Sequence, residues 1–358
     1  IVLEGFGLGV SVLDINEDGW PDLYVTNDYL SKDHLYVNNR NGTFSDQVDQ
    51  YFKHVSHFAM GNDVGDINND GLQDVLTVDM LPEDNYHRKI MFGPNQYDKF
   101  YFAVSQGYGY QYMRNTLQLA NENGSYSEIG QLAGIEKTEW SWAPLIADFD
   151  NDGYQDIVIS NGYGKDVTNL DYLKFMQPML GLSKEERRKK LLDRPAVIVP
   201  NFAFKNNRDN TFSKASAEWG FDTPSMSSGM AYADLDVDGD LDLVVNNIDQ
   251  EAFVYENTAR EKSPNASNYI QVRLAGTEKN IEGLGATVIV RSGKLLLSKY
   301  LTTVHGFESS VQNIVHFGLG KNSKIDTLSV KWNDRISVIA NPGINKMVTV
   351  SYEGSSVS

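Results

Sequence analysis

The chain contains no cysteine among its 358 residues. Disulfides therefore contribute nothing to its stability, and a catalytic thiol or a thiolate metal site is excluded. Basic residues are also scarce: 31 Lys and Arg face 48 Asp and Glu, which gives a formal net charge of −17. Because phosphate affinity depends on clustered Lys and Arg, this balance argues against a nucleic-acid partner. The sequence shows no apolar run long enough for a transmembrane segment and no secretory signal peptide.

Motifs that identify common enzyme classes are missing as well. The sequence has no GxSxG elbow, no HExxH helix and no phosphate-binding GxxxxGK[ST] loop. Its histidines are scattered, and only His54 and His57 lie three residues apart. A metal pair there would need a further ligand that the sequence does not nominate, so a structural role is preferred. We therefore predict no catalytic residues.

The sequence instead contains an acidic loop motif that occurs four times, at Asp14–Asp22, Asp66–Asp74, Asp148–Asp156 and Asp234–Asp242. Each copy carries Asp or Asn at positions 1, 3 and 5, Gly at position 6 and Asp at position 9. Ca²⁺ prefers six to eight oxygen ligands, which a tight loop supplies from alternate side chains and a backbone carbonyl. A single copy would be read as an ordinary surface turn, but four copies at matched spacing indicate calcium sites.

The candidate calcium ligands are the side chains at positions 1, 3, 5 and 9 and the backbone carbonyl at position 7. They are Asp14, Asn16, Asp18, Trp20 and Asp22; Asp66, Asn68, Asp70, Leu72 and Asp74; Asp148, Asp150, Asp152, Tyr154 and Asp156; Asp234, Asp236, Asp238, Asp240 and Asp242. We expect about four Ca²⁺ ions, which would reduce the net charge of −17 to about −9. The glycines at position 6 are expected at positive φ.

The segments around the loops exclude an EF-hand. An EF-hand places helices on both sides and a bidentate Glu at position 12, where this chain has Val25, Thr77, Ile159 and Val245. Short β-branched runs follow each loop, so the loop is expected to join two strands. A small residue recurs five positions before each loop, at Gly9, Gly61, Ala143 and Gly229.

Three copies continue into a second hairpin, at 34–46, 115–128 and 201–214, and the fourth keeps only its first strand, at 253–257. Asn41-Gly42 and Asn123-Gly124 predict two-residue turns in the first two hairpins. Each copy thus reads as a four-stranded unit, and such units repeated along a chain suggest propeller blades.

These repeats resemble the FG-GAP/VCBS repeats of integrin-α-like β-propellers, in which each blade carries a DxDxDG calcium loop. The resemblance covers residues 1–260 and implies an all-β fold: a calcium-binding β-propeller with four recognisable blades. Such propellers usually have seven blades, so further blades are expected before Ile1. Two insertions, at 80–114 and 162–200, interrupt the later blades.

Residues 268–352 contain strand patterns without acidic loops, which predicts a small antiparallel β-sandwich. The phrases GLGATVIV, GFESS, HFGLG and LSVKWNDR resemble the ASPIC/UnbV domain, which often follows VCBS propellers in bacterial surface proteins. In this family one turn usually has the sequence Trp-Pro-Asp-Gly, whereas this chain has Trp332-Asn333-Asp334-Arg335.

Each insertion has two interpretations. The first holds nine aromatics, which either pack as a satellite core or present a binding surface: Tyr86, Phe92, Tyr97, Phe100, Tyr101, Phe102, Tyr108, Tyr110 and Tyr112. The second is expected to be helical, with a capping box from Ser183 to Glu186. Its basic cluster at 187–190 is either a solvated helix face or a docking patch for an acidic partner.

The favoured function is a non-enzymatic, calcium-stabilised extracellular or cell-surface module that binds a protein or glycan partner. The domain order is typical of Bacteroidetes surface proteins, and by that analogy it implies a subunit of an outer-membrane assembly. The alternative is a carbohydrate-active enzyme, a lyase or hydrolase, on a propeller scaffold. RNA binding, a label sometimes attached to ASPIC/UnbV domains, is disfavoured because residues 268–352 have no dense basic stripe.

Overall fold

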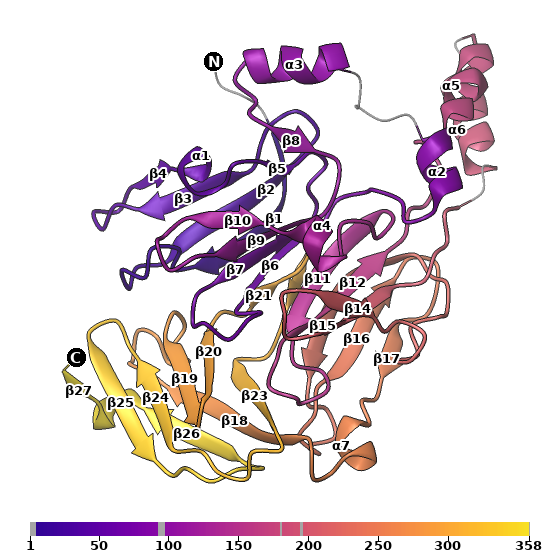
Figure 1. Ribbon diagram of the computed structural model, residues 1–358. Helices are drawn as coiled ribbons and strands as arrows, with labels where there is room; N and C mark the ends of the chain where they lie inside the picture. The colour runs from indigo at the N-terminus through magenta and orange to yellow at the C-terminus, as the bar shows by residue number, and fades with distance from the viewer. Residues whose placement is uncertain (1–4, 92–96, 180, 194–195, 358) are drawn as a thin grey trace.

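The computed structural model describes residues 5–91, 97–179, 181–193 and 196–357. Within these residues the fold is mostly β-strand, as the sequence predicts, and short helices occupy the connections. Four antiparallel sheets, here called blades 1 to 4, follow one another along the chain and fan out side by side, and a two-sheet sandwich follows them (Figure 1). None of the described helices is long and apolar enough to cross a membrane.

Blades 1 to 3 share one strand order: an inner strand, the acidic loop, a second strand, and an outer hairpin. Their strands are β1 (Phe6–Leu13), β2 (Asp22–Asp28), β3 (His34–Asn38) and β4 (Phe44–Asp46); β6 (Asn62–Gly65), β7 (Asp74–Thr77), β9 (Thr116–Ala120) and β10 (Tyr126–Glu128); β11 (Ser141–Ala147), β12 (Asp156–Asn161), β13 (Phe202–Asn206) and β14 (Phe212–Lys214). Blade 4 has three strands, as expected: β15 (Ser227–Ala233), β16 (Asp242–Asn247) and β17 (Phe253–Tyr255).

The outer hairpins exist, but the two-residue turns predicted for them are wrong. Residues 39–43 connect β3 to β4, and residues 121–125 connect β9 to β10. The Asn41 side chain accepts a hydrogen bond from the Thr43 N–H at 3.0 Å, while Arg40 and Gly42 take φ of 59° and 84°. This Asx-type bond stabilises a longer loop than the dipeptide suggests.

Neighbouring blades pack face to face through apolar cores. Leu13, Leu35 and Val75 belong to the core between blades 1 and 2; Leu76, Leu117 and Ile157 to the next; Leu145, Val158 and Leu243 to the last. Strands β7 and β12 are buried on both faces, whereas β2 and β3 of blade 1 alternate between buried and partly exposed residues. Among the described residues no strand pairing or hydrogen bond joins blade 4 to blade 1, so the four blades form an open arc. Membership of a seven-bladed ring stays a prediction.

The C-terminal sandwich consists of two sheets around a core that includes Ile270, Val288 and Leu328. One sheet holds β23 (Ile314–Gly320), β18 (Asn268–Ala275) and β26 (Met347–Ser351); the other holds β20 (Leu295–Tyr300), β19 (Thr287–Ser292), β24 (Thr327–Lys331), β25 (Arg335–Ala340) and β27 (Ser356–Val357). Because β18 pairs with β26 in parallel, the sandwich is not wholly antiparallel as predicted. Its strands extend past residue 352, and a short 3₁₀ helix, η2 (Tyr352–Gly354), precedes the last one.

A hairpin of the sandwich inserts between the inner strands of the blades. Its strands are β21 (Val304–His305) and β22 (Ser309–Ser310), and Figure 1 shows β21 lying between the blades and the sandwich. Gly306 bridges to Asn62 of blade 2, and His305 Nδ1 lies 2.6 Å from Asp63 Oδ1. The sequence predicts that this GFESS segment belongs to the sandwich alone, so its insertion between the blades is a correction.

Close packing against the next inner strand or against this hairpin explains the small residue that recurs before each acidic loop. A Cβ at Gly61 would lie 2.3 Å from the Trp142 carbonyl oxygen and 2.9 Å from that of Gly306. A Cβ at Gly229 would lie 2.7 Å from Ser309 Oγ. The small side chains therefore leave room for the next inner strand or for the hairpin.

Both insertions leave the blades at positions that a side-chain amide closes. The Asp79 N–H donates to Asn115 Oδ1 at 2.8 Å, and the Asn161 N–H donates to Asn201 Oδ1 at 2.9 Å. In blade 1 the Asn27 N–H donates to Asp33 Oδ1 in the same way, at 2.9 Å, across a short connection. A hydrogen bond thus joins the two residues that flank each insertion.

Short helices and one small sheet fill the connections. The first insertion holds α2 (Asn85–Ile90), α3 (Tyr97–Ser105) and β8 (Gln111–Tyr112), which pairs with β5 (Val55–Ser56). The second holds α5 (Leu170–Met176), η1 (Gln177–Met179) and α6 (Lys184–Leu192), and the capping box at Ser183 and Glu186 is confirmed. The remaining helices are α1 (Val48–Tyr51), α4 (Gly130–Ala133) and α7 (Ala259–Lys262). In Figure 1, α2, α3, α5 and α6 lie on the side of the blades away from the sandwich.

The inserted hairpin predicts a stability effect at Phe307, which is buried and packs its ring 5.0 Å from that of Trp142. Phe307→Ala should lower the free energy of unfolding by about 3–5 kcal/mol, because it removes a large buried side chain. Phe6→Ala is the matched control, since Phe6 is 66% exposed and should cost less than about 0.5 kcal/mol. Urea unfolding in calcium buffer measures both; equal effects would show that the hairpin does not hold the blades.

Candidate metal centres

The backbone of all four acidic loops adopts one conformation. The position-6 glycines Gly19, Gly71, Gly153 and Gly239 have φ of 83°, 91°, 93° and 94°, which confirms the expectation for them. Position 4 is left-handed as well, at Glu17, Asn69, Asn151 and Val237, with φ of 55°, 61°, 58° and 65°. This second left-handed residue is not predictable from the sequence, because only glycine is a clear sequence signal of that conformation.

Hydrogen bonds within the loop fix the side chains that the sequence nominated as ligands. In the third loop, Asp148 accepts the N–H groups of Asp152 and Gly153 at 3.0 and 2.8 Å. Asp150 Oδ1 accepts the Asp152 N–H, and Asp152 Oδ1 accepts the Tyr154 N–H. Asp14 and Asp66 repeat the position-1 pattern.

The aspartate at position 9 has a second role that the sequence did not reveal. Its carboxylate accepts one N–H from position 2 of the loop and one from the end of the third strand of the same blade. In blade 3 these donors are Phe149, at 3.1 Å, and Asn206, at 2.9 Å, both to Asp156. Asp22, Asp74 and Asp242 make the same pair of bonds. Position 9 therefore links the loop to the third strand of its blade.

The third and fourth loops bring three carboxylates together as a divalent cation site requires. Ligand atoms of Asp148, Asp150 and Asp156 lie within 4.8 Å of one another, and those of Asp234, Asp236 and Asp242 do the same. In loops 1 and 2 an asparagine stands at position 3, and its amide donates to the position-5 carboxylate: Asn16 to Asp18 at 3.1 Å and Asn68 to Asp70 at 2.9 Å. Donor sets made only of oxygen fit Ca²⁺.

Burial shifts the acid–base behaviour of these groups. It raises the pKa of Asp22 to about 6 and that of Asp66 to about 7. In the third loop burial, together with the charge of Asp150, holds the pKa of Asp148 and Asp156 well above the usual range. Bound Ca²⁺ would neutralise these carboxylates, so protons and the metal compete for the same oxygens.

Side-chain amides link each loop to the next. Asn69 Nδ2 donates to the Gly153 carbonyl at 2.8 Å, and Asn151 Nδ2 donates to the Gly239 carbonyl at 2.9 Å. Gln155 Nε2 donates to the Asp66 carbonyl at 3.0 Å. The Asp14 N–H donates to Gln73 Oε1 at 2.8 Å, so loops 1 to 4 form one connected row.

The sandwich packs onto this row. His316 Nε2 lies 2.6 Å from Asn151 Oδ1, and the Gly320 N–H donates to the Asn151 carbonyl at 2.8 Å. In the fourth loop the position-1 carboxylate of Asp234 accepts Gln271 Nε2 at 2.6 Å instead of a loop N–H. A cavity of about 550 Å³ separates loops 1 and 2 from the sandwich, and Lys299 and His305 are among its lining residues.

Four cations that contact the loops were not predicted from the sequence, and one of them, Arg260, donates Nη1 to the Asp238 carbonyl at 2.6 Å. Arg40 Nη2 lies 2.9 Å from Asp18 Oδ2, Arg208 Nη2 lies 2.8 Å from Asp152 Oδ2, and Lys205 Nζ bonds Asp150. A signal for Arg40 and Arg208 was present, because Asn-Asn-Arg occurs at both 38–40 and 206–208. No local signal marks Gln271 or His316, whose contacts come from distant strands.

The aromatics of the first insertion divide between the two interpretations. Phe100 packs against Tyr101, Tyr110 and Tyr112, which is a satellite cluster. Tyr97 and Phe102 are largely exposed on α3. Phe92 lies outside the described residues.

His54 and His57 do not form a metal pair. His54 Nε2 lies 3.0 Å from Glu128 Oε2 and 3.1 Å from Arg114 Nη2, which is an ion-pair network. Burial lowers the pKa of His57 to about 4, so its ring is neutral. These contacts agree with a structural role for both.

Comparison with known proteins identifies both parts of the chain. A model of the FG-GAP-like repeat matches residues 14–77 and 101–159, which contain loops 1 to 3, and a model of the ASPIC and UnbV family matches residues 276–357. No curated protein matches the chain. A solved structure of an Agrocybe aegerita lectin, described as recognising non-reducing terminal N-acetylglucosamine, aligns at 14% identity over 94% of this chain and 81% of that one, with a TM-score of 0.30. That similarity supports no inference about fold or ligand.

The raised pKa values predict a pH-dependent response to calcium. A carboxyl whose folded-state pKa is raised contributes stability below its unfolded value of 3.8, and this contribution is lost as the pH rises through about 6 for Asp22 and about 7 for Asp66. Bound Ca²⁺ would neutralise the carboxylates that protons neutralise at low pH. The rise in Tm on adding Ca²⁺ to chelator-treated protein should therefore be larger at about pH 7.5 than at about pH 5.

Differential scanning fluorimetry at both pH values measures this, with NaCl at matched ionic strength as the control for screening. If Ca²⁺ raises Tm no more than NaCl does, the loops are not calcium sites.

Proposed function

We propose that this chain, which carries FG-GAP-like repeats and an ASPIC/UnbV domain, is a non-enzymatic, calcium-stabilised binding module of the cell surface. The observation that carries the proposal is the position of the loops. All four lie between the blades and the sandwich, where Ca²⁺ would neutralise buried carboxylates and stabilise the scaffold. About four ions, held by the position 1, 3, 5 and 9 side chains and the position-7 carbonyls, fit this role.

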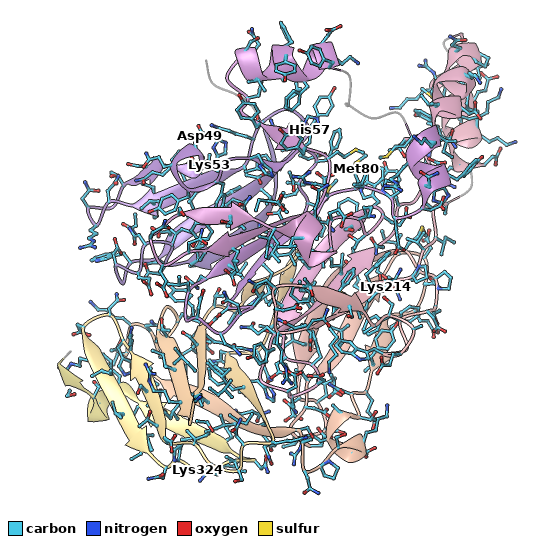
Figure 2. All side chains as sticks on the ribbon, in the orientation of Figure 1. Asp49, Lys53, His57, Met80, Lys214 and Lys324 are labelled. Atoms are coloured by element: carbon cyan, nitrogen blue, oxygen red, sulfur yellow. The ribbon has the colours of Figure 1, made fainter. Side chains whose placement is uncertain are left out.

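The contact surface for a partner lies on the opposite side, where the insertions are. Helix α3 exposes Tyr97, Tyr101 and Phe102, and such rings anchor partners or stack on sugars. Beside it, a groove of about 450 Å³ is lined by residues that include Asp49, Lys53 and Tyr110. Figure 2 shows Asp49 and Lys53 below α3. Aromatic and charged groups together suit a protein or glycan partner.

Helix α6 adds charge to the same side. None of its residues is buried, and the basic run at 187–190 stands out on an acidic protein. An acidic partner would meet this helix through a solvated surface, where each ion pair contributes little and mainly steers association.

The loops support an extracellular location, because such sites fill at the millimolar calcium outside cells. The resemblance to Bacteroidetes surface proteins extends the proposal to a subunit of an outer-membrane assembly. Neither statement needs a membrane segment in this chain.

The alternative is a carbohydrate-active enzyme, which needs a free acidic group outside the loops. Burial raises the pKa of Asp33 to about 7 and of Asp79 to about 6, as a catalytic acid requires. Both carboxyls, however, bond backbone N–H groups, Asp33 that of Asn27 and Asp79 those of His57 and Phe58. The positions that match Asp33 in blades 2 and 3 are Asn115 and Asn201, which accept the same bond without any acid chemistry. This favours structural roles for both.

A test combines a glycan array, capture of surface proteins and a product assay on the same polysaccharides. We expect binding without turnover, and Tyr97→Ser/Tyr101→Ser/Phe102→Ser should weaken it about tenfold or more, since exposed aromatics dominate such contacts. Ile281→Ser/Val338→Ser on the sandwich is the matched control, because both residues are as exposed. Turnover that Asp79→Asn abolishes would instead establish the enzyme.

A further inference from the structure

The third loop differs from the other three in one neighbouring residue. A residue at the end of the third strand, or two residues beyond it in blade 4, donates its N–H to the position-9 aspartate in every blade, at Asn38, Ala120, Asn206 and Asn257. This bond aligns the blades, and the residues just before it are Val37, Leu119, Lys205 and Glu256. Only blade 3 places a cation at that position.

Lys205 reaches into the ligand set of its own loop. Its Nζ bonds Asp150 Oδ2, the position-3 oxygen, and lies 3.8 Å from Asp152 Oδ2, at position 5. Arg208, which lies in the outer hairpin, places its Nη2 2.8 Å from the same Asp152 oxygen. Two cations therefore share the carboxylates nominated for Ca²⁺.

The charge and burial of the third loop explain why cations are needed beside it. The third loop carries four carboxylates, against three in each of the first two loops. Asp148 and Asp156 are buried, and this loop is bonded to loops 2 and 4 and to the sandwich. Lys205 and Arg208 pair with two of its four carboxylates, and the charge of Lys299 acts on a third, Asp148.

We propose that Lys205 is a resident cation of the third loop, which holds Asp150 in place without calcium and weakens the binding of Ca²⁺ there. Calcium must displace the ammonium from Asp150 or bind beside it, and either route costs affinity because like charges repel. Blade 3, on which both neighbours depend, thus stays ordered when calcium is low. This inference rests on the proposal that the loops bind calcium.

Lys205→Met is the test variant, and Lys214→Met is its matched control. Lys214 lies in the same blade, is 45% exposed against 44% for Lys205, and pairs with Glu83 instead of a loop. Figure 2 labels Lys214 on the outer part of the blade. Lys205→Arg keeps the charge and should resemble the wild type.

Two measurements should separate the variants. In calorimetric titration of chelator-treated protein with Ca²⁺, Lys205→Met should tighten one site about tenfold, while Lys214→Met leaves all sites within about twofold. Lys205→Met should also lower Tm in chelator but not in saturating Ca²⁺, and failure to fold in chelator alone would be the extreme form of this result.

An unchanged isotherm, or an equal loss of Tm with and without Ca²⁺, would show that Lys205 forms only a surface ion pair and would overturn the inference. If wild-type protein itself binds no Ca²⁺, the proposed function fails instead. The two failures are therefore distinguishable.

Discussion

The concentration of negative charge on one face of the blades is the constraint on which the rest of the structure depends. Fourteen aspartates occupy the side-chain ligand positions of the four loops. Like charges at close range repel, and burial raises the cost of each one. The chain offsets this with backbone N–H donors on the carboxylates at positions 1 and 9 and with Arg40, Lys205 and Arg208. Divalent cations would complete the balance, which is why these loops make better metal sites than surface turns.

The same charge explains why the sandwich cannot be treated as a separate module. The sequence predicts two domains, at 1–260 and 268–352, but contacts cross between them at both ends of the interface. Gln271 and His316 bond residues of the acidic loops, and the hairpin around Gly306 lies between the inner strands. Removing the sandwich would expose carboxylates on one side and small inner-strand residues such as Gly61 on the other.

The sequence predicted those features that depend on neighbours along the chain. Four such local features are the loops, their left-handed glycines, the strand order of the blades and the capping box at Ser183. The first three could be recognised because they repeat along the chain. The insertion of the hairpin was not predictable, because the GFESS sequence does not indicate which strands it contacts. Gly61 and Gly229 indicate only that another segment of the chain approaches them closely. The five-residue outer turns were missed because the Asn41 side chain, not the Asn-Gly dipeptide, decides the turn.

The two faces of the blades differ in how freely they can vary. One hydrogen bond closes the connection between the second and third strands: Asn27 with Asp33, Asp79 with Asn115, and Asn161 with Asn201. The enclosed segments are 28–32, 80–114 and 162–200, so the same closure accepts a short turn or a helical insertion without disturbing the strands. The loop face has no such freedom, because its carboxylates, cations and sandwich contacts constrain one another. Recognition of a partner is therefore expected where the insertions are, and stability where the loops are.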